Sequence, residues 1–431
     1  MASGLSKTKW HDTSLPTFNL PIADTSIDVD LSYQGKKSIP EILSTKKSNI
    51  SLTWQGKTTT NRLYYGNNLS ILANLLEDEK IRGKVQLIYI DPPYATKGVF
   101  QTRSQKDAYS DLLEGSHYIE FLRERLIILR ELLAPNGSIY VHLDENMAFY
   151  IKVIMDEVFG KNNFRNWITR KKCNPKNYTR KTYGDISDYI LFYTKSDEYV
   201  WNRAYDKWTD EKALKEYSYV EEGTGRRYKK VPIHAPGTRN GETGKMWRGM
   251  MPPTGKHWQY TPETLDAMDA RGEIFWSSNG NPRRKVYLDE SEGIPAQDIW
   301  LDYKDAHNQN IEITGYPTEK NPNLLKRIIE ASSNADDLVL DCFSGSGTTL
   351  EVASQLNRKW IGIDNSHEAI KTTLNRFANG TEPMGDYVGK KTKTKSMPLF
   401  RITDFELYSE TERNKELDEL VKQWREWIAD S

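Results

Sequence analysis

The chain has 431 residues, a length that exceeds a typical single core and predicts one large α/β domain with a substantial insert, or two domains. Its 60 Lys and Arg balance its 60 Asp and Glu, so the net charge does not point to a nucleic-acid partner. There is no apolar run of about 18 residues, and the two cysteines are too few for a disulfide framework. These features argue against a membrane-spanning or disulfide-stabilised secreted protein, and we expect a soluble protein in the reducing cytoplasm.

The first part of the chain reads as a polar arm followed by an α/β block. Residues 1–50 have weak periodicity, and regular structure is expected to begin near Trp54. The α/β block is predicted over residues 51–200. Its expected elements are a strand and turn at 62–68, a helix at 69–76, a fully buried strand at 85–90, a helix at 118–133, a strand at 138–143, a helix at 148–159 and a strand at 188–194.

The pattern changes between residues 201 and 297. Aromatic residues, glycine and proline become frequent, helical periodicity fades, and turn signals such as Asn240-Gly241 and Asn279-Gly280 recur. This composition predicts an inserted segment of short strands and loops.

The α/β pattern returns over residues 298–400. The expected elements are a helix at 323–332, a strand at 338–341, a helix at 348–356 and a strand at 360–364. Residues 401–431 are predicted to form a C-terminal helix, with apolar positions at helical spacing between 404 and 428.

The strand at 85–90 runs directly into Asp91, Pro92, Pro93 and Tyr94. Consecutive prolines fix the backbone direction and remove N–H donors, which leaves their carbonyl groups available as acceptors. The Asp91 carboxylate and the Pro92 carbonyl could accept both N–H bonds of an exocyclic amine, while Tyr94 stacks on its ring. For this segment alone, an ordinary turn that ends a buried strand is the alternative.

The strand at 338–341 runs into a turn with two glycines, Gly345 and Gly347. Such a turn between a strand and a helix lets a ligand approach the backbone and meet the N–H groups of the helix. The next strand ends in Asp364, 19 residues after Gly345, where a carboxylate suits the hydroxyls of a ribose. Dinucleotide enzymes have a third glycine that would fall at Leu350, and this difference weakens an NAD interpretation.

Together the two motifs resemble those of DNA amino-methyltransferases of the permuted β group. In that group Asp-Pro-Pro-Tyr precedes the target-recognition region and a Phe-x-Gly motif follows it. The modification subunits of Type III restriction systems are similar but longer. The resemblance covers roughly residues 62–194 and 298–376, and it places residues 201–297 in the position of the recognition region. It implies a Rossmann-like methyltransferase fold, circularly permuted in motif order and dependent on S-adenosylmethionine.

The resemblance also implies a role for individual residues. The catalytic residues would be Asp91, Pro92, Pro93 and Tyr94. The residues around the methionine part of S-adenosylmethionine would be Asp341, Phe343, Ser344, Gly345, Gly347 and Thr348. Thr318 and Lys320 lie in a segment similar to the family's Thr-Glu-Lys-Pro, with Lys320 expected at the cofactor carboxylate, and Asp364 is expected at the ribose. Asn67 occupies the position where the family usually has an acid near the adenine of the cofactor. No metal is expected.

The expected substrate is double-stranded DNA, with the target nucleotide flipped out of the duplex. A cognate restriction endonuclease and a second copy of the chain are the expected protein partners. Asp rather than Ser at position 91 favours adenine N6, and cytosine N4 is the alternative. A C5-cytosine enzyme would need a Pro-Cys nucleophile, whereas Cys173 follows Lys172 and Cys342 follows Asp341.

Two other classes of protein stay open at this stage. A dehydrogenase would use the glycine turn but leaves the Asp91 motif unexplained. A catalytically silent DNA-binding protein would need a damaged catalytic turn, and Asp91 and Tyr94 are intact. His142 is predicted to be a packing residue at a strand end rather than a base.

A local excess of basic residues predicts where DNA is held. The segment from Lys161 to Lys181 contains eight Lys and Arg and no Asp or Glu, a pattern that can neutralise phosphates. Solvated surface loops are the alternative for any single cluster. Interleaved aromatic residues, among them Trp167, Trp247, Trp258 and Trp276, favour a nucleic-acid face. The predicted DNA contacts are Arg170, Lys171, Lys172, Lys176, Tyr178, Arg180, Lys181, Arg226 and Arg227.

Overall fold

The computed structural model describes residues 31–57, 60–93, 115–174, 181–305, 312–313, 319–380, 382–383 and 401–429. The chain divides into two compact units. The larger unit combines Met1–Asn202 with Gln297–Ser431, and the smaller unit is Arg203–Ala296. The smaller unit occupies the stretch where the composition of the sequence changes. Its assignment as the recognition region stays a prediction.

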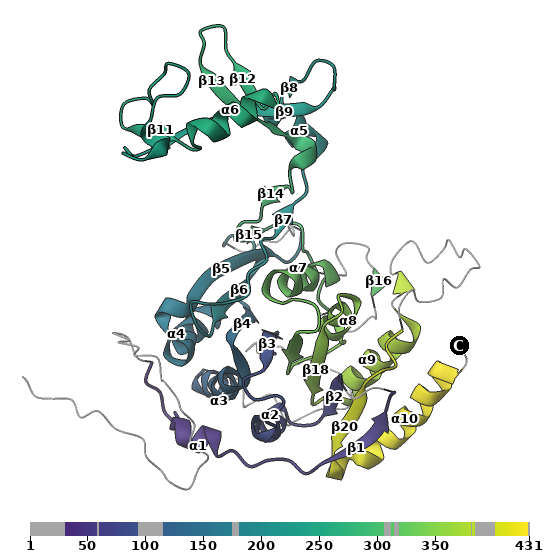
Figure 1. The fold of residues 1–431 in the computed structure, drawn as a ribbon. Helices are drawn as coiled ribbons and strands as arrows, with labels where there is room; N and C mark the ends of the chain where they lie inside the picture. The colour runs from purple at the N-terminus through teal and green to yellow at the C-terminus, as the bar shows by residue number, and fades with distance from the viewer. Residues whose placement is uncertain are drawn as a thin grey trace, which may run out of the picture. The chain divides into compact units, whose positions relative to one another are not determined.

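A ten-stranded sheet forms the centre of the larger unit (Figure 1), in the order β1-β20-β2-β18-β17-β3-β4-β6-β5-β15. Five neighbours in its middle run parallel: β2 (Arg62–Tyr65), β18 (Lys359–Asp364), β17 (Leu338–Asp341), β3 (Val85–Ile90) and β4 (Leu133–Leu143). Beyond β4 lie β6 (Ser187–Thr194), β5 (Phe164–Lys171) and β15 (Ile299–Trp300), and β6 is antiparallel to both β4 and β5. Beyond β2 lie β20 (Glu406–Glu410) and β1 (Ile50–Gln55).

Helices cover both faces of this sheet. One face carries α1 (Ile39–Leu43), α2 (Asn68–Glu77), α3 (Ser116–Leu132) and α4 (Ala148–Phe159). The other carries α7 (Pro322–Ser332), α8 (Thr348–Gln355), α9 (His367–Asn379) and α10 (Asn414–Ala429). Parallel strands with helices on both faces make a doubly wound, Rossmann-like α/β fold. The predicted fold class is confirmed.

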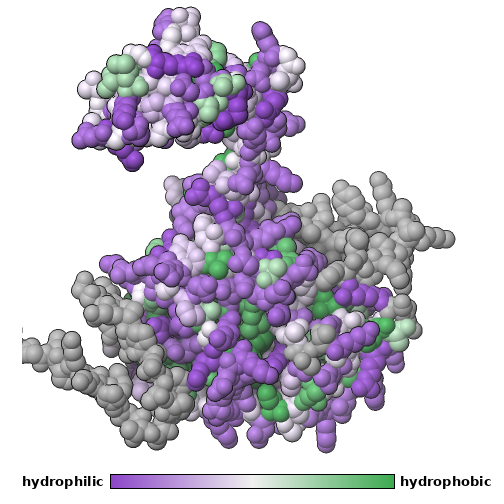
Figure 2. Space-filling model, in the orientation of Figure 1, coloured by the Kyte–Doolittle hydropathy of each residue, from purple (hydrophilic) through white to green (hydrophobic). Residues whose placement is uncertain are grey.

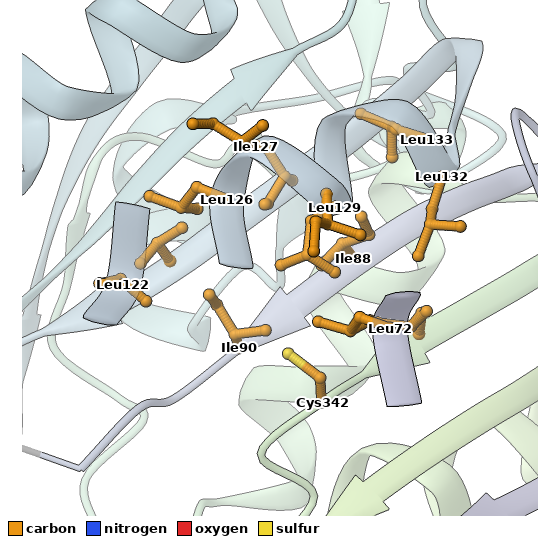
Figure 3. Packing of buried hydrophobic residues seen from close by; sticks show 14 of the residues in the cluster. Leu72, Ile88, Ile90, Leu122, Leu126, Ile127, Leu129, Leu132, Leu133 and Cys342 are labelled. Atoms are coloured by element: carbon orange, nitrogen blue, oxygen red, sulfur yellow. The ribbon is translucent and has the colours of Figure 1, made fainter. Parts of the chain in front are cut away.

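Two hydrophobic cores lie between the sheet and its helices. Side chains of β3 alternate between them, with Ile88 and Ile90 in the first core and Leu87 and Tyr89 in the second. Figure 3 shows Ile88 and Ile90 packed with Leu72 of α2 and with leucines of α3. Outside these cores, Figure 2 shows a mainly hydrophilic surface, with hydrophobic residues scattered in small groups.

The ends of the larger unit differ from the sequence-based expectation. Residues 39–43 form α1, started by a capping box at Ser38, and residues 50–55 form β1, so the predicted arm is structured in its described part. The prediction of one helix over 404–428 was wrong, because Glu406–Glu410 forms β20 between β1 and β2. Backbone pairing with β1 and β2, which are distant in the sequence, outweighed the helical periodicity of this segment. The remaining short elements of this unit are η1 (Lys161–Asn163), η6 (Thr411–Arg413), β16 (Glu312–Ile313) and β19 (Glu382–Pro383).

The smaller unit is built on the four-stranded sheet β12-β13-β9-β8. Its strands are β7 (Tyr205–Asp206), β8 (Tyr219–Val220), β9 (Arg227–Pro232), β10 (His234–Pro236), β11 (Lys256–Trp258), β12 (Ile274–Trp276), β13 (Pro282–Tyr287) and β14 (Ile294–Pro295). Its helices are α5 (Asp210–Glu216), η2 (Glu242–Gly244), α6 (Pro262–Ala270) and η3 (Leu288–Glu290). None of the helices among the described residues of either unit is long and apolar enough to cross a bilayer.

Trp247 and Trp258 form the core of the smaller unit together with Ile233, Leu265 and Met268. These two tryptophans are 1% and 3% exposed, so they cannot stack on a nucleic acid in this conformation. Their contribution to a nucleic-acid face, inferred from their spacing among basic residues, is therefore not supported. They explain instead how a loop-rich segment holds a compact shape.

Candidate active site

Three aspartates meet at one edge of the central sheet. Asp91 directly follows β3, Asp341 ends β17 and Asp364 ends β18, and these three strands are parallel neighbours. The helix after β17 packs on one face of the sheet, and the helix after β3 packs on the opposite face. A crevice opens at such a reversal in doubly wound sheets, outside the carboxyl ends of the strands. The two motifs of the sequence therefore share one site.

The glycine turn between β17 and α8 needs its glycines for their backbone angles. Gly345 and Gly347 have φ of 49° and 76°, in the left-handed region that side chains disfavour. A Cβ on Gly347 would also lie 2.8 Å from the side chain of Thr373. The Gly347 N–H donates to the Ser344 carbonyl at 2.8 Å, and α8 begins at Thr348. The turn thus presents backbone and the start of a helix toward the crevice.

Asp341 and Asp364 stabilise this turn by accepting hydrogen bonds from its backbone. Asp341 accepts the Phe343 N–H at 3.0 Å and the Thr349 hydroxyl at 2.6 Å. Asp364 accepts the Gly345 N–H at 2.8 Å and the Ser366 N–H at 2.9 Å. Burial raises the pKa of Asp341 to about 7 and also raises the pKa of Asp364.

The two aspartates differ in what they can offer a ligand. Asp341 is only 2% exposed, so it shapes the turn rather than facing the crevice. Asp364 is partly exposed, and each of its carboxylate oxygens has a second lone pair that a ribose hydroxyl can use.

Arg376 of α9 anchors the turn and was not anticipated from the sequence. Its Nε donates to the Ser346 carbonyl at 2.8 Å, and its guanidinium pairs with Glu319 and Glu351. The side chain is 1% exposed. A signal was available, because Arg376 falls within the apolar stripe of α9, between Thr373 and Phe377, where a buried cation requires partners.

Lys320 lies between the two motifs. Its Nζ is 2.9 Å from the Asp91 Oδ2, and both side chains are largely buried. The preceding residue, Glu319, is tied by Arg376 to the glycine turn. In the structure Lys320 pairs with Asp91, and its expected contact with the cofactor carboxylate stays a prediction. Tyr94 and Thr318 lie outside the described residues.

Asn67 and Asn68, which follow β2, make different contacts. The Asn67 side chain accepts the Leu69 N–H at 2.9 Å and caps α2. Asn68 is buried, donates to the Cys342 carbonyl at 2.7 Å and accepts from the Arg125 Nε at 2.7 Å. Asn68 therefore links the end of β2 to the glycine turn, a role that the sequence motif did not indicate.

The predicted DNA-contacting residues fall into different surroundings. Arg170 is 1% exposed and is bound to Asp188 and Asp305, so its side chain is not available to a phosphate and the sequence-based expectation for it needs correction. Lys171 is partly exposed on β5, and Lys172 pairs with Asp185 at 2.6 Å. Lys181 is exposed, while Lys176, Tyr178 and Arg180 lie outside the described residues.

The last two predicted DNA contacts belong to the smaller unit. Arg226 lies over the Tyr287 ring and pairs with Asp289 and Glu290. Arg227 donates to the Tyr217 carbonyl at 3.5 Å.

Residues 85–375 match the model of a protein family described as DNA methylase. The chain is 45% identical over 421 residues to the Type II methyltransferase M.EcaI of Enterobacter cloacae, covering 93% of this chain and 92% of that protein. It is 25% identical over 359 residues to the StyLTI Mod subunit, a Type III restriction-modification enzyme of Salmonella typhimurium, and covers 75% of this chain and 54% of the subunit. A solved complex of M1.HpyAVI with S-adenosylmethionine aligns with a TM-score of 0.40 at 18% identity, over 73% of this chain and 98% of that one.

The residues of the crevice fit S-adenosylmethionine, the cofactor of this family. The cofactor carries a ribose and a methionine part, and the site offers the partly exposed Asp364 carboxylate beside a turn whose glycines let a ligand approach the backbone. The Ser344 hydroxyl is buried without a hydrogen-bond partner among the described residues, as expected of a group whose partner is a ligand. The chain belongs to the N6/N4 family of DNA methylases and is a DNA methyltransferase that uses S-adenosylmethionine.

Proposed function

We propose that this chain methylates the exocyclic N6 of adenine within a specific sequence of duplex DNA, as the modification enzyme of a restriction-modification system. One observation carries the proposal. Asp91, Pro92 and Pro93 follow β3 at the point where the sheet reverses its winding, beside the glycine turn after β17. This arrangement puts hydrogen-bond acceptors for an amine next to a cofactor turn.

Asp91 and Pro92 would hold the amine that is methylated. The Asp91 carboxylate and the Pro92 carbonyl accept its two N–H bonds, which favours tetrahedral geometry at nitrogen and directs the lone pair toward the methyl group. Each carboxylate oxygen has two lone pairs, so Asp91 can accept from Lys320 and from the amine together. When bound, S-adenosylmethionine supplies an electrophilic methyl group on its sulfonium. The contribution of this chain is then orientation of the amine.

The cofactor would be held by the turn at Phe343–Gly347 and by Asp364. The Ser344 hydroxyl is buried without a hydrogen-bond partner among the described residues, and Gly345 and Gly347 leave the backbone open to a ligand. Asp364 would accept the ribose hydroxyls while it keeps its bonds to the turn. Asp341 would act through the turn, because its two oxygens bind Phe343 and Thr349.

Adenine is proposed over cytosine because Asp91, rather than a serine, begins the Pro-Pro-Tyr motif. The target base would be flipped out of the duplex and stacked on Tyr94. The restriction-modification context rests on relatives: one is named a Type II methyltransferase and another a Type III restriction-modification subunit. A cognate restriction endonuclease is the protein partner that follows.

Sequence recognition would lie on one face of the β12-β13-β9-β8 sheet. Opposite residues of paired strands point to the same face, so Lys230 and Lys285 project together, as do Phe275 and Arg283. Lys230 lies 3.5 Å from the ring centroid of Tyr219 and 3.4 Å from that of Phe275. Basic side chains among aromatic rings can contact phosphates and bases. This face is a stronger candidate than the buried tryptophans.

One experiment tests the reaction and the site together. The chain is expressed in a host that lacks adenine methylation, and the host DNA is sequenced for modified bases beside a matched Asp91→Ala strain. We expect N6-methyladenine at one sequence motif with the unchanged chain and none with Asp91→Ala. N4-methylcytosine at a motif would support the alternative reaction. Unmodified DNA, together with no transfer by the purified chain supplied with S-adenosylmethionine, would refute the proposal.

A further inference from the structure

A row of buried polar side chains crosses the larger unit at the carboxyl edge of its sheet. Each of four neighbouring strands contributes one residue: Tyr89 from β3, His142 from β4, Asp188 from β6 and Arg170 from β5. All four are at most 1% exposed. The strand registers place them on the same face, because Arg170 is opposite Asp188 and His142 is opposite Ile190, two positions from Asp188.

Close polar contacts join the four side chains. The Tyr89 hydroxyl is 2.8 Å from the His142 Nδ1, and the His142 Nε2 is 2.9 Å from the Asp188 Oδ2. The Arg170 Nε donates to the Asp188 Oδ1 at 2.8 Å. Burial lowers the pKa of His142, so the neutral ring can accept from the Tyr89 hydroxyl at Nδ1 while its Nε2 lies beside Asp188.

The row ends at residues 303–305, which contact Asn321, the neighbour of Lys320. Arg170 donates to the Tyr303 carbonyl at 3.0 Å and pairs with Asp305 at 2.8 Å. Between these two residues, the Lys304 carbonyl accepts from the Asn321 Nδ2 at 3.0 Å. Asn321 is the neighbour of Lys320, which contacts Asp91. Asp91 in turn lies two residues after Tyr89, so the contacts close a ring around the catalytic carboxylate.

Stability alone does not account for this row. Removing two ions and a histidine from water is costly, and apolar residues of similar volume often stabilise a protein as well as a buried ion pair does. A buried network of polar contacts across four strands also restricts its side chains to one arrangement. The arrangement held here includes residues 303–305, which are bonded to the neighbour of Lys320.

The geometry points to His142, Asp188 and Arg170 as positioning residues of the methyl transfer, which fix residues 303–305 and through them hold Lys320 against Asp91. This inference rests on the proposed role of Asp91. In this inference Arg170 supports the active site from within the protein and does not contact DNA phosphates. His142 is likewise a positioning residue, although the sequence suggested only packing.

The test compares two buried arginines of the same unit. Arg170→Lys keeps the charge but cannot reach Asp188, Tyr303 and Asp305 together. Arg123→Lys is the matched control, because Arg123 is 3% exposed and binds Glu157 at 2.8 Å and the Lys37 carbonyl at 2.9 Å, between α3, α4 and the segment before α1. Each variant is measured for unfolding free energy, DNA affinity and the rate of a single methyl-transfer turnover. Asp188→Asn and His142→Gln extend the series.

We expect Arg170→Lys to slow the single turnover roughly 10- to 100-fold, as a displacement of about 1 Å at a reacting group does. DNA affinity and its salt dependence should stay as in the unchanged chain. The control should keep its turnover rate within about twofold at a comparable loss of stability. Equal rates in the two arginine variants would overturn the inference, and so would weaker DNA binding with a reduced salt slope in Arg170→Lys, which would mark Arg170 as a phosphate contact.

A second readout does not depend on catalysis. In cofactor-free protein, acetic anhydride labels exposed lysines, and mass spectrometry follows the rate at Lys320. Arg170→Lys should raise this rate several-fold and Arg123→Lys should leave it unchanged. An unchanged rate in Arg170→Lys would overturn the positioning role. If the rate rises but the unchanged chain methylates no DNA, the network stands and the proposed function alone fails.

Discussion

The Nζ of Lys320 lies 2.9 Å from the Oδ2 of Asp91, although the two residues are far apart in the sequence and belong to different motifs. This pair joins the segment after β3 to the glycine turn after β17, because Glu319 beside Lys320 is tied through Arg376 to that turn. The two motifs are therefore held together by one connected group of side chains.

Asp91→Ala should abolish methyl transfer, a loss on the order of 10³-fold or more, because it removes an acceptor aimed at the reacting amine. Binding of S-adenosylmethionine should change little, since Asp91 is not part of the glycine turn. Radiometric transfer and calorimetry check the two halves of this prediction. Normal turnover by the Asp91→Ala variant would mean that another carboxylate holds the amine.

Gly347→Ala should weaken cofactor binding at least tenfold. The substitution strains a backbone with φ of 76° and puts a methyl group 2.8 Å from Thr373. Gly83→Ala is the control, because Gly83 has φ of 67° but nothing within 4 Å of the added carbon. Each variant should lose at least about 1 kcal/mol of stability from backbone strain, and Gly347→Ala should lose more because Thr373 must shift. Calorimetry should show weaker binding for Gly347→Ala alone, and equal affinities would place the cofactor elsewhere.

Asp341 should make the unfolding free energy depend on pH. Burial raises its pKa to about 7, so between about pH 4 and pH 7 the folded chain keeps a proton that the unfolded chain has lost. The contribution of Asp341 to stability is therefore fully present below about pH 4 and decreases as the pH rises to about 7, by at most about 4 kcal/mol.

Asp341→Asn isolates this effect. Asparagine keeps an acceptor for the Phe343 N–H and removes the titration. His142, whose pKa is lowered by burial, contributes the opposite slope in both proteins and cancels in the comparison. Urea denaturation at pH 5 and pH 7.5 should show that Asp341→Asn gains stability over the unchanged chain at the higher pH. The same difference at both pH values would show that Asp341 does not titrate in this range.

Lys230→Gln should weaken DNA binding and lower the slope of log affinity against log salt by roughly one, because it removes one cation from the face formed by β9 and β13. Lys422→Gln, on the exposed side of α10, is the control and should leave the slope unchanged. Fluorescence anisotropy at several salt concentrations measures both. An unaltered slope for Lys230→Gln would move the DNA face to another part of the smaller unit.

The sequence determined the elements whose patterns are local. The strand at 85–90, the helix at 148–159 and the strand at 338–341 have the bounds that their periodicity predicted. The two motifs also sit where the sequence put them, at the ends of β3 and β17, because a glycine or a proline acts on its own backbone. These signals need no knowledge of the rest of the chain.

Tertiary structure decided everything that depends on distant partners. The segment at 406–410 has a helical pattern but became β20, because β1 and β2 offered backbone hydrogen bonds that the segment could satisfy only as a strand. Arg170 looks like a surface cation in a basic stretch, yet Asp188 and Asp305 bury it. Charge and periodicity describe a residue by its neighbours along the chain, whereas burial and pairing depend on strands brought together from far apart, and this is why the ring around Asp91 could be found only in the folded molecule.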